Sequence, residues 1–118
     1  MQTISIKSGT SAKITVTPKI NGVNATASQL SGMTIYVFFV HQFTNKVYNQ
    51  PYQLSSDNLT INLTPADTVA MLGEAEENQK FEIQFAIKDS SGNIVAEEKD
   101  SSVAINIIRW EAGLWLQK

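Results

Sequence analysis

The stretch Phe81–Lys88 reads FEIQFAIK and carries the clearest structural signal in the chain. Apolar residues stand at every second position, with mostly polar residues between them. Side chains of a β-strand point alternately to opposite faces, so this spacing predicts a strand with one face in a core and the other near water. The polar run Asp89–Asn93 that follows is typical of a turn. We therefore predict a strand that ends in a tight reversal of the chain.

The same two-residue period recurs along most of the sequence. Further strands are predicted at residues 4–6, 14–16, 33–41, 59–63, 94–96 and 103–107, with a short one at 46–48. Thr64 before Pro65 and Gly73 after Leu72 are typical helix boundaries and predict one short helix over Pro65–Leu72. Seven to eight short strands separated by turn signals predict an all-β fold, an immunoglobulin-like antiparallel β-sandwich with one short helix near residues 65–72. We expect the sandwich to span residues 1–108 and an apolar C-terminal tail to span 109–118.

Composition excludes several kinds of function. The 118 residues include no Cys and one His, which removes thiol catalysis and zinc–thiolate sites. Nine Lys and Arg against eleven Asp and Glu give a net charge of −2 without a basic cluster, so nucleic acid is not an expected partner. The sequence has no signal-peptide pattern and no apolar run of membrane-spanning length, so we expect no membrane partner and synthesis in a host cytoplasm.

Five segments stand in a recognisable order along the chain: Ile6–Thr10, Leu30–Thr34, Leu59–Thr68, Phe81–Ile87 and Asp89–Ile94. The third runs from a strand into Leu-Thr-Pro-x-Asp-Thr, and the last contains an Asp-x-x-Gly turn. Over roughly residues 4–108, this order resembles the N-terminal domain family of baseplate upper proteins and related immunoglobulin-like domains of tailed phages.

The resemblance implies a structural protein of a tailed phage or prophage that attaches to or decorates the tail, the baseplate or the capsid. It implies other virion proteins, copies of this chain, or both as partners, with a homo-oligomer in the particle and the virion as the location. The baseplate pattern continues into a fibrous or receptor-binding part that this sequence lacks. A capsid or head role therefore stays open beside a tail role.

Apolar residues in excess of one buried face predict a protein contact surface. The strand at 33–41 is apolar on both faces, and the tail carries two Trp and two Leu, residue types that favour interfaces or cores. The predicted interface residues are Tyr36, Phe38, Val40, Arg109, Trp110, Leu114, Trp115 and Leu116. The tail either folds back over the second face of that strand or inserts into a neighbouring protein, and the sequence leaves both open. Its spacing fits a helix or a strand.

A carbohydrate-binding or adhesion module is the alternative function. Tyr48, Asn49 and Tyr52 lie in a polar, aromatic segment and are its candidate glycan-binding residues. His41 is interpreted as a structural histidine at a strand end, since the sequence offers no nucleophile and orienting acid to accompany it. We therefore expect no enzymatic activity, no catalytic residue, no cofactor and no metal site.

Overall fold

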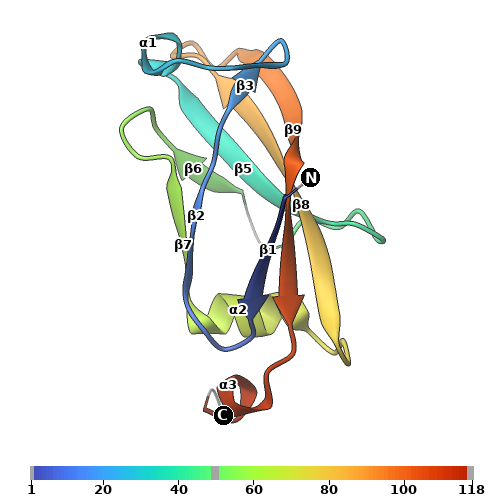
Figure 1. The fold of residues 1–118 in the computed structure, drawn as a ribbon. Coiled ribbons are helices and arrows are strands. Elements are labelled where there is room, and N and C mark those ends of the chain that lie inside the picture. The colour runs from blue at the N-terminus through green and yellow to red at the C-terminus, as the bar shows by residue number, and fades with distance from the viewer. Residues whose placement is uncertain (1, 49–50, 117–118) are drawn as a thin grey trace.

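The computed structural model describes residues 2–48 and 51–116, and it is mostly β, which confirms the predicted all-β class. Its larger sheet is mixed, because its first strand runs parallel to its neighbour and the other pairs are antiparallel. Figure 1 shows this sheet along the length of the molecule. In spatial order its five strands are β1 (Gln2–Lys7), β9 (Ile94–Ile108), β8 (Asn78–Lys88), β5 (Thr34–His41) and β6 (Tyr52–Leu54).

Two smaller pairs of strands complete the β-structure. An antiparallel pair, β2 (Ala12–Thr15) with β7 (Thr60–Leu63), lies across one face of the larger sheet (Figure 1). A hairpin joins β3 (Lys19–Ile20) to β4 (Val23–Asn24) at one end of the molecule. Its turn residues Asn21 and Gly22 have φ angles of 53° and 78°, the left-handed region that an Asn-Gly turn requires.

The core lies between the larger sheet and the β2–β7 pair. The alternating apolar residues of Phe81–Lys88 all point into it and are at most 4% exposed, so the predicted alternation is confirmed. They pack against inward side chains of both sheets: Ile14, Ile35, Val37, Phe39, Ile61, Leu63, Ile105 and Ile107. Burying a Val, Leu, Ile or Phe side chain stabilises the fold by about 1.5–3 kcal/mol. This layer therefore holds the two sheets together without a disulfide.

The last strand differs from the prediction. The sequence predicts separate strands at residues 94–96 and 103–107, whereas β9 runs without interruption from Ile94 to Ile108. Its register against β8 shifts twice, between Glu82 and Ile83 and again between Ile87 and Lys88. Bulges of this kind take up extra residues without ending a strand, so the charged segment between the two apolar runs remains paired.

Three helices are described, of which the sequence predicts one. α2 (Pro65–Leu72) has the predicted bounds: the Thr64 hydroxyl accepts from the Asp67 N–H, and the Asp67 carboxylate accepts from the Thr64 N–H. α1 (Ala27–Leu30) is a single turn within a segment predicted as a loop, and its Leu30 is buried. α3 (Glu111–Leu116) is formed by the tail, so the open choice between helix and strand resolves as a helix.

Candidate functional site

The predicted interface residues lie in two separate places. Tyr36, Phe38 and Val40 belong to β5 and lie on or near the outer face of the larger sheet. The residues from Arg109 onward belong to the tail, beyond the end of β9 at one pole of the molecule (Figure 1). Of the two alternatives left open for the tail, folding back over the second face of β5 is excluded, because α3 packs against a turn at the pole.

The outer sheet face is less apolar and less exposed than its sequence indicates. Tyr36 and Phe38 are half-buried, and Lys88 places its ammonium 5.2 Å from the centre of the Tyr36 ring. Val40 is only 4% exposed, because the chain returns at Val47 and forms a β-bridge with it. The prediction that Val40 contributes to a contact surface is therefore wrong.

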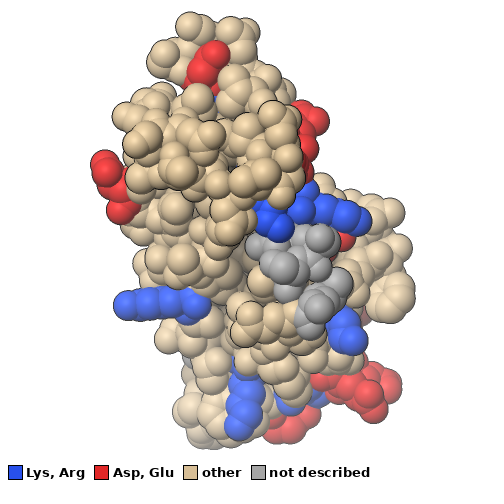
Figure 2. Space-filling model, turned by 45° about the horizontal axis from the view of Figure 1, so that its top comes forward, with Lys and Arg blue, Asp and Glu red and all other residues tan. Residues whose placement is uncertain are grey.

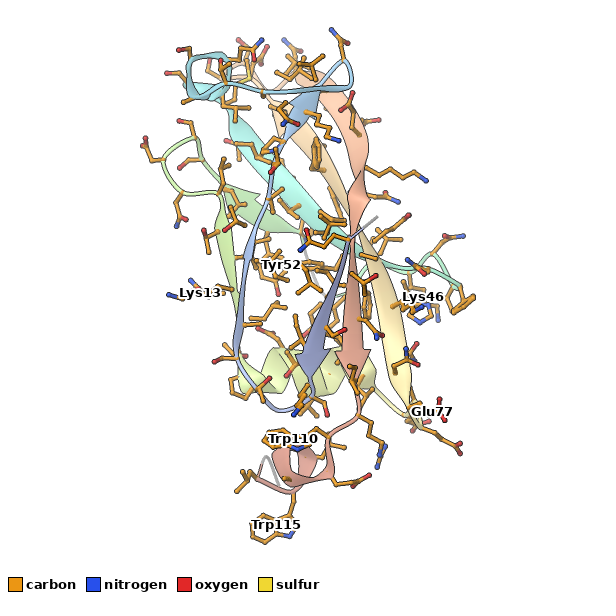
Figure 3. All side chains as sticks on the ribbon, viewed as in Figure 1. Lys13, Lys46, Tyr52, Glu77, Trp110 and Trp115 are labelled. Atoms are coloured by element: carbon orange, nitrogen blue, oxygen red, sulfur yellow. The ribbon has the colours of Figure 1, made fainter. Side chains whose placement is uncertain are left out.

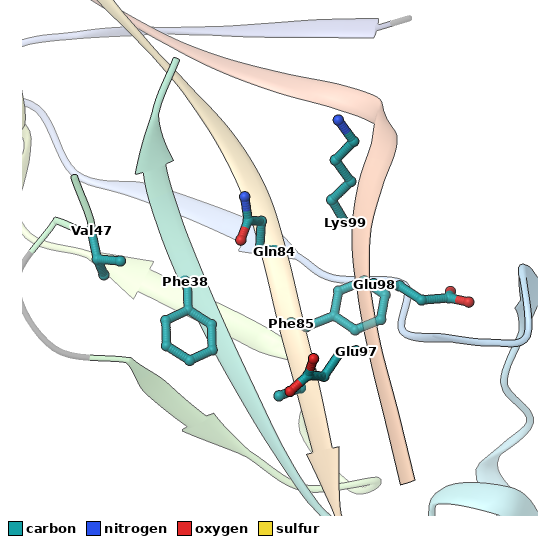
Figure 4. Close-up of a pocket in the computed structure, with 8 residues that line it drawn as sticks. Phe38, Val47, Gln84, Phe85, Glu97, Glu98 and Lys99 are labelled. Atoms are coloured by element: carbon teal, nitrogen blue, oxygen red, sulfur yellow. The ribbon is translucent and has the colours of Figure 1, made fainter. Parts of the chain in front are cut away.

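A shallow depression of about 540 Å³ lies on this face (Figure 4). Phe38 and Val47 supply apolar lining, Gln84 of β8 lies beside Phe38, and two charged side chains of β9 lie on the same face. Those charged residues are Glu97 and Lys99, whereas the Glu98 carboxylate points away and accepts the Gly22 N–H. The face therefore combines a half-buried aromatic ring with charges of both signs.

α3 is held against the turn between β1 and β2, residues 8–10, which we call the anchor turn. Gly113 of α3 lies directly against Gly9 of the anchor turn. The space is so narrow that a Cβ atom added to Gly9 would lie 2.7 Å from Gly113 Cα. A Cβ on Gly113 would overlap the Ser8 carbonyl oxygen and lie 2.7 Å from Trp110 Cε3. Ser8 is fully buried, and its hydroxyl accepts the backbone N–H of Trp110 at 2.9 Å. Two glycines are therefore required for the helix to approach the turn this closely.

The anchor turn is itself held by α2. Thr68 is fully buried, and its hydroxyl accepts the Gly9 N–H at 2.9 Å. The same hydroxyl donates to the Thr10 carbonyl oxygen at 2.9 Å, with the Pro65 carbonyl oxygen at 3.0 Å. One side chain thus satisfies a donor and an acceptor of the anchor turn. Through this bond α2 fixes the surface on which α3 rests.

Arg109 and Trp110 orient the start of the tail. The Arg109 N–H donates to the Glu77 carbonyl oxygen at 2.7 Å, and its guanidinium reaches the Ala75 carbonyl oxygen and the Glu111 carboxylate. Lys7 lies with its ammonium 5.5 Å from the centre of the Trp110 ring, a cation–π contact. These contacts fix α3 relative to the sheets.

Large apolar side chains are exposed on α3 and just before it. Trp115 is 69% exposed and Leu116 65% exposed, while Trp110 is 37% exposed. Figure 3 shows the Trp115 ring pointing away from the body of the molecule. Leu114 is half-buried and packs against the core, so it acts mainly within its own chain. We call Trp110, Trp115 and Leu116 the α3 surface.

The two candidate glycan-binding tyrosines are half-buried and pack within the fold. Both side chains pack against the core. The Tyr52 ring (Figure 3) stands edge-on to the Phe39 ring, with the ring centroids 5.6 Å apart. The Tyr48 hydroxyl donates to Asp67 at 3.1 Å. Burial, followed by the adjacent Asp67 carboxylate, raises the pKa of Tyr48 to about 12, and burial likewise raises the pKa of Tyr52. Asn49 lies outside the described residues.

His41 ends β5 and contacts both the loop that follows it and the neighbouring strand β8. Its Nδ1 accepts the backbone N–H groups of Phe43 and Thr44, and its Nε2 meets Gln79 Oε1. The ring stands edge-on to Phe81, with centroids 5.5 Å apart. Because Nδ1 is an acceptor, Nε2 carries the proton and donates to Gln79. This arrangement supports the interpretation of His41 as a structural residue that shapes the loop after β5.

Among the side chains that the structure describes within residues 2–48 and 51–116, no three acidic or histidine groups gather closely enough to hold a metal ion. No helix in that part of the chain has the length and apolar character needed to cross a membrane.

Sequence reasoning missed the residues that position the site. Ser8, Gly9, Thr68 and Gly113 hold α3 in place, and none of them was a candidate. Their sequence signals were a turn composition at Ser8–Thr10, the place of Thr68 in the Leu-Thr-Pro-x-Asp-Thr motif, and a glycine within an apolar tail. No family model, curated protein or solved structure matches the chain.

Proposed function

We propose that this protein is a non-enzymatic structural protein that acts through protein–protein contacts. Specifically, we propose an immunoglobulin-like domain in the virion of a tailed phage or prophage, where it attaches to or decorates the tail, the baseplate or the capsid. Its partners are other virion proteins, copies of itself, or both. The motif order over residues 4–108 is the basis for the phage assignment.

The strand order supports the immunoglobulin-like part of the proposal. In variable-type immunoglobulin sandwiches, the sheet that contains strands G, F and C is extended by C′, and strands B and E belong to the opposite sheet. Here β9, β8, β5 and β6 are consecutive neighbours in one sheet, in the order of strands G, F, C and C′. The pair β2–β7, which corresponds to strands B and E, lies on the opposite side of the core. The short helix α2 lies between β7 and β8, the equivalents of strands E and F in this comparison.

The observation that carries the contact role is the α3 surface. A short helix with exposed Trp and Leu side chains gains little from folding unless its other side is held, and here two glycines and buried Ser8 hold it. Tryptophan is enriched among the residues that contribute most to protein interfaces, and its burial removes a large apolar area from water. The fold thus fixes a small apolar surface at one pole, in an orientation that a partner can bind.

Immunoblotting of purified particles tests the virion proposal. An antibody raised against the recombinant chain is used to probe density-gradient fractions of a lysate from cells that carry the gene. We expect the chain to sediment with the particles. A tagged Trp115→Glu chain supplied in trans should lose this association, whereas a tagged Phe43→Glu chain, altered at an exposed aromatic in the turn after β5, should keep it. Particles that form in a lysate where the chain stays entirely in the unsedimented fraction would contradict the proposal.

A further inference from the structure

The hairpin of β3 and β4 turns at Asn21 and Gly22, which are exposed at the end of the molecule away from α3 (Figure 1). Figure 2 brings this end toward the viewer and shows a largely uncharged surface with scattered acidic and basic side chains. A Cβ atom added to Gly22 would meet no atom of the described structure within 4 Å. The space beside the turn is therefore open to water.

An asparagine followed by a glycine can modify itself without an enzyme. The backbone nitrogen of the glycine attacks Cγ of the asparagine, and the new N–Cγ bond closes a five-membered succinimide ring. The Cγ–Nδ2 bond breaks, so that Nδ2 takes a proton from water and leaves as ammonia, while the attacking nitrogen gives its proton to hydroxide. Water then opens the ring and leaves aspartate or isoaspartate. Glycine favours the attack because it has no side chain to obstruct the nitrogen.

The conformation of the turn prevents this attack. Asn21 and Gly22 have φ angles of 53° and 78°, the left-handed values that a two-residue Asn-Gly turn requires. In that region ψ is also positive, at about 30–60°, which directs the nitrogen of the next residue away from Cβ. The Gly22 nitrogen therefore cannot reach Asn21 Cγ until the peptide between the two residues rotates. The reaction requires the hairpin to open first.

The pairing within the hairpin offers little resistance to opening. Each strand has two residues, paired as Lys19 with Asn24 and Ile20 with Val23. Both residues of β4 are exposed, and Val23 has 69% of its surface in contact with solvent. A two-stranded ribbon of this kind is marginally stable in water when it stands alone. A contact from outside the hairpin therefore decides how long the turn stays closed.

Glu98 of β9 supplies that contact. Its carboxylate accepts the Gly22 N–H at 2.6 Å, from a position 76 residues further along the chain. Figure 4 shows its side chain extending from β9 away from Phe38 and Gln84. Hydrogen bonds to an ionised acceptor are stronger than those between neutral groups. This bond engages the nitrogen that would attack, and it ties the turn to the larger sheet.

From this arrangement we infer that Asn21 is a self-modification site and that Glu98 limits its rate. Glu98 is a positioning residue, because its carboxylate keeps the Gly22 nitrogen out of reach of Asn21 Cγ. Isoaspartate, one of the two products, lengthens the backbone by one atom within a two-residue turn. It therefore disturbs the pairing of Ile20 with Val23, whose register depends on the length of the loop. This inference is independent of the proposed contact role.

Peptide mapping by mass spectrometry, after incubation of the full chain in mildly alkaline buffer, tests the inference. We expect slow conversion of Asn21 in the wild type. Conversion in Glu98→Ala should be at least about threefold faster, the factor that follows from loss of one surface hydrogen bond. Glu98→Gln keeps an acceptor of similar shape without the charge, so its rate should lie between the two.

Glu97→Ala is the matched control. It removes the neighbouring carboxylate, which belongs to the opposite face of β9 because successive residues of a strand alternate. We expect this variant to convert at the wild-type rate. Circular dichroism verifies that each chain stays folded during the incubation.

The same incubation in urea separates the effect of the fold from that of the sequence. Unfolded chains lack the bond between Glu98 and Gly22, so the wild type and Glu98→Ala should convert at one rate. That rate should exceed the rate of the folded wild type.

Three results would overturn the inference. Equal rates in the folded wild type and folded Glu98→Ala would show that the bond does not limit the reaction. A slower Glu98→Ala would give Glu98 the opposite role, that of the base that removes the Gly22 proton. An unfolded wild type that converts no faster than the folded chain would show that the turn gives no protection.

Discussion

Gly113→Ala is expected to destabilise the protein, although the same change in an unobstructed helix does the opposite. Replacing glycine by alanine in a solvent-facing helix usually stabilises by about 1 kcal/mol. At Gly113 the added methyl would overlap the Ser8 carbonyl oxygen and lie 2.7 Å from Trp110 Cε3. The Trp110 ring can rotate, but Ser8 belongs to a buried backbone that cannot. We therefore expect α3 to separate from the anchor turn.

The interactions lost on separation set the size of the effect. The bond from the Trp110 N–H to the Ser8 hydroxyl contributes about 1 kcal/mol net. The half-buried Leu114 contributes on the order of 1–2 kcal/mol through its contact with the core. Subtracting the helix-propensity gain of about 1 kcal/mol leaves a net loss of about 1–2 kcal/mol. For a chain of this length, the corresponding fall in Tm is roughly 3–10 °C.

Urea unfolding followed by two signals measures this loss. The two Trp residues of the chain are both in the tail, so their fluorescence reports on the docking of α3, while circular dichroism reports on the sheets. Gly113→Ala should shift the emission to longer wavelength before urea is added and lower the midpoint of unfolding. Ala112→Gly, at the exposed neighbouring position, gives the helix-propensity contribution in the same helix without a clash.

The sign of the change decides whether the reasoning holds. A Gly113→Ala protein that is more stable than the wild type, with unchanged Trp emission, would show that the methyl fits and that the glycine contact does not position α3.

Three further predictions concern the groups around α2. Burial beside Asp67 raises the pKa of Tyr48 from 10 to about 12, so the folded chain favours the protonated phenol. The stability that this preference adds is complete below pH 10 and is lost as the pH rises from 10 to 12. Thermal unfolding across that range should show a steeper loss in the wild type than in Tyr48→Phe, and equal slopes would refute the assignment. Thr68→Val should cost about 1–3 kcal/mol in urea unfolding, because the Gly9 N–H loses its acceptor, while Thr68→Ser keeps the hydroxyl and should cost less. Thr64→Ala should cost about 1 kcal/mol through loss of the α2 N-cap, and Thr64→Ser should stay within a few tenths of the wild type; equal losses in both would argue against the cap.

Local signals account for the elements that the sequence predicted well. The alternation in Phe81–Lys88 places four apolar side chains on one face whatever the rest of the fold, because successive residues of a strand point to opposite sides. The bounds of α2 follow from Thr64, Pro65 and Gly73, which act within one turn of the helix end. Val40 shows the limit: its exposure depends on where a loop returns, and the β-bridge to Val47 buries it.

The sequence by itself determined the period-two strands, the position of α2 and the excess of apolar residues in the tail. Each of these depends on backbone geometry over a few residues or on composition. Only the tertiary structure decided that the tail is a helix, which side of it is free, and that it rests at a pole rather than on β5. Those outcomes depend on Ser8, Gly9 and Gly113 meeting across nearly the whole length of the chain. Contact between residues so distant in sequence is set by how the sheets bring the chain ends together, and no local pattern records it.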